Sequence, residues 1–272
     1  MHERIIKLRN AYAGREALFI GTGASLCDYN LHNLRDDIVT FGFNRLVPYY
    51  KDFWPELKLD FYMCHDPTVF QTSFYQQFCL RKELEYDEGY DLQNQHVLKY
   101  KDLSTANSII ENKLYENTKI IFSSNTINPH AKRFSLKQNS EWITDNLDLI
   151  NQNDNFLPYK IQTNISCYKF PSVVDDCLEL TLWAKNSFCN SGLPIMFYLG
   201  FSKIYLAGVD YNNKGHFFCK STNAVNYVDK EYSDLELLVK SVSDSVKIYT
   251  IRHKDSSIVT EHGGVEFSTL EK

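Results

Sequence analysis

The sequence predicts an α/β protein with a mostly parallel β-sheet flanked by helices. Short apolar runs typical of buried strands alternate along the chain with segments of helical pattern, as in strand–helix–strand units. Five of these runs end in glycine, hydroxyl, amide or carboxylate residues, which is typical of strands that lead into a ligand site. The length of 272 residues suits one large α/β domain, or a domain with a sizeable insertion.

The expected elements follow from these patterns in chain order. Strands are expected at residues 17–20, 36–44, 57–67, 118–125, 202–211 and 246–251. Helices are expected at residues 1–16, 68–118, 190–201 and 229–241. Residues 126–187 are polar and rich in asparagine, so we interpret them as an irregular lid inserted into a single domain spanning residues 1–272.

Composition excludes several classes of protein. A net charge of −5 argues against a protein that binds duplex nucleic acid. Seven cysteines without a C-x-x-C pair predict reduced thiols, a cytoplasmic location and no zinc site. No run approaches the roughly 18 apolar residues of a membrane span.

A glycine-rich loop follows the first expected strand in "LFIGTGASL", residues 18–26. The dinucleotide fingerprint needs a third glycine and a later acid, and this loop has neither. We therefore predict that Gly21, Thr22, Gly23 and Ser25 seat another nucleotide phosphate. The alternative is a tight turn in which Ser25 caps a helix.

Polar residues at the ends of the other strands would converge on the same edge of a parallel sheet. We expect them to contact the ribose, base or sugar of a nucleotide sugar; they are Asn44, Asp66, Ser124, Asn125 and Asp210. A second anion seat is predicted where Asn190, Ser191 and Gly192 begin a helix. Taken singly, each of these residues could instead end a strand, form a turn or cap a helix.

His216 is the predicted general base, since it lies on a short loop just past the strongest strand. The alternative is a loop histidine packed beside Phe217 and Phe218. Tyr211 is the second catalytic candidate. The chain lacks an Asp-x-Asp pair for a metal-bound diphosphate, which favours a donor with one phosphate, or no transferase chemistry.

Four blocks of the sequence stand in a recognisable order: "GREALFIGTGASLCDYNLHNL", "VTFGFNRL", "DFYMCHDP" and "KIYLAGVDY…GHFF". Together they resemble a bacterial family of glycosyltransferases related to motility-accessory-factor and 6-hydroxymethylpterin diphosphokinase-like proteins. The same order of blocks resembles the bacterial sialyltransferases that extend lipooligosaccharide from CMP-sialic acid. The resemblance implies a Rossmann-like domain with a lid, CMP bound across the strand ends, and inverting transfer without a metal or resident cofactor.

The sequence departs from the sialyltransferase pattern at several places, including the glycine loop, the position shortly before "NSG" (Phe188 for an arginine), the position two past Asp210 (Asn212 for a tyrosine) and the catalytic histidine. Thr22 and Ala24 replace the asparagine and proline of the family's glycine loop. The family's catalytic histidine precedes the last helix, where this chain reads "NAVNYVDK" without a histidine.

Our interpretation is a glycosyltransferase that moves a sialic-acid-like or Kdo-like sugar from CMP to a glycan of a lipopolysaccharide or capsule. A lipid-linked acceptor would bring the protein to the inner face of the membrane, and oligomeric state is left open. The alternatives are an ATP-dependent enzyme like 6-hydroxymethylpterin diphosphokinase and a nucleotide-binding protein without catalysis.

Overall fold

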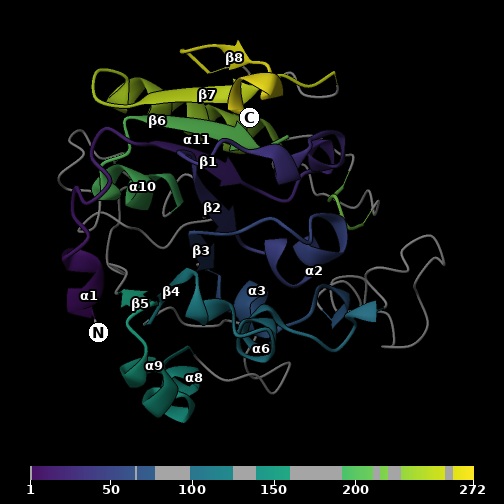
Figure 1. The fold of residues 1–272 in the computed structure, drawn as a ribbon, viewed down its shortest axis with the longest axis vertical. Helices are drawn as coiled ribbons and strands as arrows, with labels where there is room; N and C mark the ends of the chain where they lie inside the picture. The colour runs from purple at the N-terminus through teal and green to yellow at the C-terminus, as the bar shows by residue number, and fades with distance from the viewer. Residues whose placement is uncertain are drawn as a thin grey trace.

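The computed structural model contains an eight-stranded, all-parallel sheet in the order β5-β4-β3-β2-β1-β6-β7-β8 (Figure 1). It describes residues 2–64, 66–76, 99–124, 139–159, 192–210, 215–219, 228–254 and 260–272. The strands are β1 Glu16–Ile20, β2 Val39–Phe43, β3 Phe61–Cys64, β4 Lys119–Ser123, β5 Phe156–Tyr159, β6 Lys203–Ala207, β7 Lys247–Ile251 and β8 Gly264–Val265. The α/β fold class expected from the sequence is confirmed.

Helices cover both faces of this sheet and enclose two separate cores. Helices α1 (His2–Ile6), α10 (Leu193–Leu199) and α11 (Val228–Val242) pack on one face. Helices α2 (Leu46–Phe53) and α6 (Thr105–Glu111) pack on the other, with the short turn η7 (Phe267–Leu270). The remaining described helices and turns are η1 Ala24–Asp28, η2 Leu31–Asn33, α3 Pro67–Gln71, η4 Leu114–Glu116, α8 Asn139–Asp145 and α9 Leu147–Gln152.

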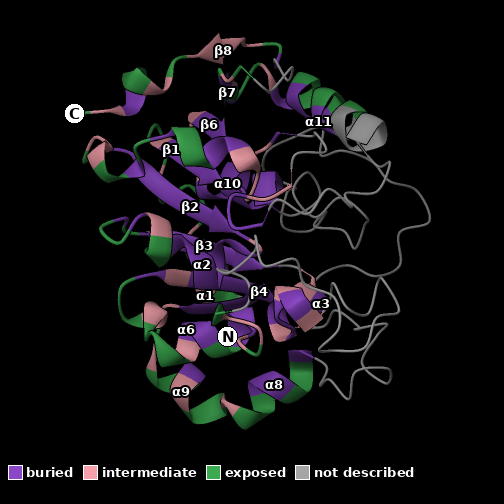
Figure 2. Cartoon of the chain, turned by 90° about the vertical axis from the view of Figure 1, so that its right-hand side faces the viewer, coloured by how far each residue is buried: buried purple, intermediate pink, exposed green. Residues whose placement is uncertain are grey.

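Strand β1 shows why the sequence forms a sheet buried on both sides. Ala17 and Phe19 belong to the core under α1, α10 and α11, whereas Leu18 and Ile20 belong to the opposite core. All four side chains are almost fully buried, so the strand reads as a continuous apolar run rather than an alternating one. Figure 2 shows the same pattern, with buried strands and a buried α10, while α8, α9 and α11 carry exposed residues.

The predicted lid is the main point at which the sequence interpretation needs correction. Within residues 126–187, the stretch 139–159 forms α8, α9 and the edge strand β5 rather than an irregular insertion. Proline at position 158 argues against a central strand but is compatible with an edge, and among the described strands β5 pairs with β4 alone. The rest of the predicted lid, 126–138 and 160–187, lies outside the described residues.

Three other predicted segments also differ from the structure. The helix expected over residues 1–16 is confined to α1, and residues 7–14, before β1, form turns. The helical region expected over 68–118 contains α3, α6 and η4, while 77–98 lies outside the described residues. The loop expected after β7 includes the two-residue strand β8.

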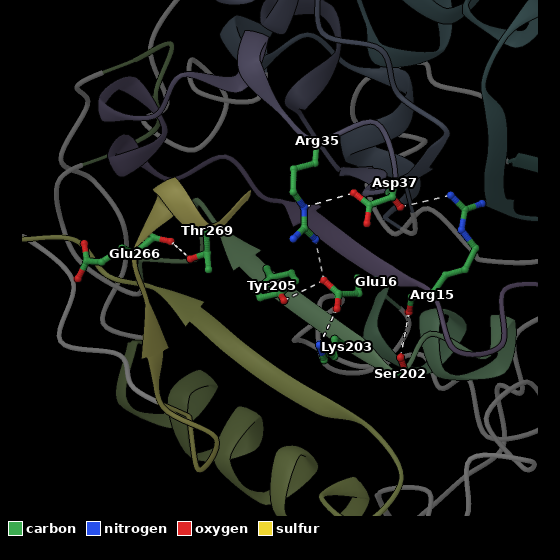
Figure 3. A network of polar contacts seen from close by, with 9 residues as sticks. All are labelled: Arg15, Glu16, Arg35, Asp37, Ser202, Lys203, Tyr205, Glu266 and Thr269. Atoms are coloured by element: carbon green, nitrogen blue, oxygen red, sulfur yellow. Dashed lines mark hydrogen bonds and ion pairs between the residues drawn. The ribbon is translucent and has the colours of Figure 1, made fainter. Parts of the chain in front are cut away.

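A polar network fixes the amino end of β1, at the edge of the sheet opposite the loops that follow the strands (Figure 3). The carboxylate of Glu16 accepts hydrogen bonds from Lys203 (2.6 Å), Arg35 (2.9 Å) and the hydroxyl of Tyr205 (3.0 Å). Partial burial alone would raise the pKa of Glu16, but these hydrogen bonds outweigh it and lower the pKa. The network therefore ties β1 to β6 and to the segment before β2.

We predict that Glu16→Gln lowers the free energy of unfolding by about 1–2 kcal/mol at pH 7, because the charge-assisted hydrogen bonds weaken. A carboxylate with a lowered native pKa stabilises the fold above its unfolded pKa and loses this effect as pH falls through the native value. The difference between variant and wild type should therefore shrink below about pH 4.5, the ordinary value for this side chain. Denaturant unfolding at several pH values measures it.

Glu266→Gln is the matched control, because the Arg252–Glu266 pair is about two-thirds exposed on both sides. Its effect should stay within about 0.5 kcal/mol. An equal loss of unfolding free energy in the two variants would contradict the conclusion that Glu16 fixes the amino end of β1.

Candidate functional site

The strand order reverses between β1 and β6, which makes their carboxyl ends the switch point of the sheet (Figure 1). The chain leaves β1 toward β2 on one side and returns to β6 on the other. Ligands of open parallel sheets bind in the crevice outside such a switch point. The glycine loop, 21–25, follows β1, and the segment 208–210 follows β6, so both predicted site segments lie at this position.

The two glycines of the loop allow it to approach the segment after β6. The Gly21 N–H donates to the carbonyl of Ala207 (2.9 Å), and the Gly23 N–H donates to that of Gly208 (2.7 Å). A Cβ on Gly21 would lie 2.5 Å from the Gly208 oxygen, and one on Gly23 would lie 2.4 Å from Oδ2 of Asp210. The close approach that requires glycine is thus to protein; phosphate contact at this loop stays a prediction.

Asp210 anchors the loop from the β6 side. Its buried carboxylate accepts from the Ser25 N–H (2.8 Å) and from the Ser25 hydroxyl (2.5 Å). Burial raises the pKa of the neighbouring Tyr29 to about 12, and the nearby charge of Asp210 adds to the rise. Ser25 and Asp210 were predicted separately as ligand residues. In the structure they bond to each other and hold the glycine loop against the segment after β6, a pairing that the sequence did not predict.

His216 is brought to the same loop from the segment 215–219. Its Nδ1 lies 3.0 Å from the Thr22 hydroxyl, although the two residues are 194 positions apart. The adjoining Phe217 N–H donates to the Thr22 carbonyl (3.0 Å), and His216 forms an antiparallel bridge with Gly23. The structure therefore brings the predicted base and the predicted nucleotide loop into contact.

Aromatic side chains hold the imidazole of His216. It stacks on Phe218 with centroids 5.1 Å apart and planes at 4°, and Phe74 meets it edge-on at 5.5 Å. Phe218 in turn stacks on Tyr49 at 4.0 Å. His216 is therefore packed among aromatic rings, as the structural alternative predicted, and it also contacts the glycine loop.

Asn44, at the end of β2, adopts a left-handed backbone with φ of +49°. Its N–H donates to the Met63 carbonyl (2.8 Å), and its own carbonyl accepts from the Tyr62 hydroxyl. Asparagine tolerates this conformation better than most residues, and sparsely populated backbone conformations cluster at functional sites. Contact of Asn44 with a nucleotide stays a prediction.

Arg45, which sequence reasoning missed, is buried behind this strand end. Its guanidinium donates to the Thr72 carbonyl (2.7 Å) and hydroxyl (3.1 Å), and it lies 5.8 Å from the centre of the Phe74 ring. Burial lowers the pKa of Arg45, although nearby groups such as Tyr49 oppose this change. A cationic residue inside the apolar run "FGFNRLV" was the available sequence signal.

Asp66 and Ser124 have local structural partners. The Asp66 carboxylate caps α3 by accepting from the N–H groups of Thr68 (2.7 Å) and Val69 (3.4 Å). Ser124 donates to the carbonyl of Tyr159 at the end of β5, from its N–H (2.8 Å) and its hydroxyl (2.9 Å). These contacts match the capping and strand-end alternatives, and nucleotide contact by either residue stays a prediction.

Asn139 is a second polar residue that sequence reasoning missed at this edge. It is fully buried, donates from Nδ2 to the Ser123 carbonyl (2.8 Å) and accepts from Nε2 of Gln71 (2.8 Å). It thereby joins the ends of β4, α3 and α8. Its position in an asparagine-rich stretch concealed it, because no periodic pattern marks it as buried.

Gly192 precedes α10 and lies over β1 and β2, where an added Cβ would come within 3.1 Å of Phe43 and 3.3 Å of Phe19. Its predicted companions Asn190 and Ser191 lie outside the described residues, as do Asn125 and Tyr211. Within the described ranges, no three His, Cys, Asp or Glu side chains are grouped to hold a metal. None of the helices described there is both long and apolar enough to cross a bilayer.

Comparison with known proteins gives structural likeness at low identity. No protein-family model matches the chain, and no curated protein matches it. The solved sialyltransferase CstII from Campylobacter jejuni, in complex with the substrate analogue CMP-3FNeuAc, shares 19% identity at a TM-score of 0.40, over 87% of this chain and 80% of that one.

A second solved structure, the monofunctional alpha-2,3-sialyltransferase Cst-I from the same organism, shares 18% identity at a TM-score of 0.36, over 90% of this chain and 78% of that one. The fold of this chain is assigned from its own sheet order and register.

We predict that Asp210→Asn lowers the free energy of unfolding by about 1–3 kcal/mol, because a buried donor of Ser25 loses its charged acceptor. Asp66→Asn is the matched control, since asparagine caps helices as well as aspartate does and the effect should stay within about 0.5 kcal/mol. Denaturant unfolding measures both. Equal losses would show that Asp210 is no more than an ordinary strand-end residue.

Proposed function

We propose that this protein is a glycosyltransferase that moves an acidic, sialic-acid-like or Kdo-like sugar from a CMP donor to a glycan acceptor. The observation that carries the proposal is the contact of His216 with Thr22, 3.0 Å between Nδ1 and Oγ1, at the switch point of the sheet. A titratable side chain and a glycine loop meet there, from segments far apart in sequence. The resemblance of the sequence blocks supplies the class of donor.

In this proposal the reaction inverts the anomeric carbon and needs no metal. The acceptor hydroxyl attacks the anomeric carbon while the bond from that carbon to the CMP phosphate oxygen breaks, and CMP leaves with the electron pair. His216 takes the proton of the attacking hydroxyl. Because Nδ1 faces Thr22, Nε2 is the nitrogen that would act as base.

The donor would lie across the carboxyl ends of β1, β2 and β6. Thr22 and Ala24 are the residues through which the loop would approach the nucleotide, because the N–H groups of Gly21, Gly23 and Ser25 donate to protein acceptors. Asn44 would contact the ribose or base from the adjacent strand. Asp66, Ser124, Asn125, Asn190, Ser191 and Gly192 complete the proposed donor site.

The proposed acceptor is a glycan of a surface polysaccharide or lipopolysaccharide, elongated in the cytoplasm. A lipid-linked form of that acceptor would place the reaction at the inner face of the membrane. Packing of His216 against Phe218 favours one alternative, a nucleotide-binding protein without catalysis, and the experiments below separate the two.

We expect CMP to stabilise the protein without added metal, since one phosphate carries little charge to neutralise. At a concentration 100-fold above Kd the gain is about 2.7 kcal/mol, which a thermal-shift measurement detects. Cytidine, which lacks the phosphate, is the matched control and should stabilise less. Stabilisation by ATP only with Mg²⁺, and none by CMP, would contradict the proposal and favour the diphosphokinase-like alternative.

We predict that His216→Ala lowers kcat by about 10²- to 10⁴-fold, which is the usual contribution of a positioned base. CMP affinity should stay nearly unchanged, and the variant should lose the fall in rate at acidic pH that protonation of a base causes. His32→Ala removes an exposed histidine and serves as the control. Weaker CMP binding with normal turnover at saturating donor would instead make His216 a nucleotide contact.

A further inference from the structure

We propose that Thr22 is a positioning residue that holds His216 in the tautomer with the proton on Nδ1. In this arrangement Nδ1–H donates to the Thr22 hydroxyl oxygen, 3.0 Å away, and Nε2 carries the lone pair. The inference rests on the proposed function, because it concerns the nitrogen that would accept the proton of the acceptor.

The position of the Thr22 hydroxyl is fixed by its neighbours. Gly21 and Gly23 on either side donate their N–H groups to the carbonyls of Ala207, the last residue of β6, and of Gly208, which follows it, at 2.9 and 2.7 Å. The Thr22 carbonyl accepts from the Phe217 N–H at 3.0 Å, so the loop and the segment 215–219 are joined through both backbone and side chain. Threonine is also restricted at χ1 by its branched Cβ.

Packing alone does not decide the orientation of the imidazole. Phe218 stacks on the ring with planes at 4°, and Phe74 meets it edge-on at 84°, which fixes the plane of the ring. Rotation by 180° about χ2 exchanges Nδ1 with a ring carbon and leaves this plane unchanged. The hydroxyl of Thr22 distinguishes the two orientations, because only one of them places a nitrogen beside it.

The direction of this hydrogen bond determines what His216 can do. A neutral imidazole has one N–H donor and one acceptor nitrogen. If Thr22 accepts, Nε2 is left as a base; if Thr22 donates to Nδ1, Nε2 carries the proton and cannot accept another from a substrate hydroxyl. Removing the outer partner of a metal-bound histidine commonly changes activity by about 10- to 100-fold, and we expect an effect of the same order for this pair.

Imidazole nitrogen shifts in long-range ¹H–¹⁵N spectra of the uniformly labelled, ligand-free protein test the tautomer directly. The signals of His216 are assigned by their loss in His216→Gln. We expect a protonated Nδ1 and an unprotonated Nε2 in the wild type, and a shift toward a tautomer mixture in Thr22→Val, which keeps the shape but lacks the hydroxyl. A wild-type proton on Nε2, or identical shifts in Thr22→Val, would overturn the inference.

Turnover of the CMP donor provides the second measurement. Thr22→Val should lower kcat by about 10- to 100-fold, and Thr22→Ser, which keeps the hydroxyl, should recover both the tautomer and most of the lost turnover. The expected tautomer with no CMP binding would sink the proposed function and leave the pairing intact. Normal turnover in a folded Thr22→Val protein would reject the role of Thr22 while leaving the glycosyltransferase proposal standing.

Discussion

The hydrogen bonds between Asp210 and Ser25 determine the geometry of the site, because they join the two chain segments that diverge at the switch point. A buried carboxylate is stable only when donors surround it, and Ser25 supplies two, at 2.8 and 2.5 Å. With the loop held in this way, Gly23 lies against the Asp210 side chain and Thr22 is presented to the segment 215–219. The contact of His216 with the loop follows from that placement.

Strand β1 is attached to β6 at both of its ends, by different chemistry. Glu16 joins the amino ends through hydrogen bonds to Lys203 and Tyr205, and the glycine loop joins the carboxyl ends through backbone groups and Asp210. Between them, five register pairs connect the two strands. A site built on such a pair is held more precisely than one built on loops alone. The polar network around Glu16 at the amino end of β1 thus supports the geometry of the candidate site at its carboxyl end.

The sequence predicted the parts of this arrangement that depend on local pattern. Apolar runs, five of them with polar ends, marked six of the strands, because full burial on two faces requires continuous apolar residues. It also brought His216 and the glycine loop to one edge of the sheet, since carboxyl ends of parallel strands share that edge. Features that depend on tertiary contacts could not be predicted from the sequence. The edge strand β5 contains a proline, and the burial of Arg45 and Asn139 depends on partners distant in sequence.

The glycine loop shows why a motif can be located correctly and still be interpreted incompletely. Gly-x-Gly indicates close backbone approach, and the sequence cannot specify what approaches. In this structure the neighbours are the end of β6 and the segment that follows it, and the N–H groups of the two glycines donate to the carbonyls of Ala207 and Gly208. The same is true of His216, whose aromatic packing was considered an alternative to a chemical role. Packing that fixes the ring plane and a hydroxyl that selects its orientation are both conditions for a positioned base, so the two interpretations of this residue are complementary.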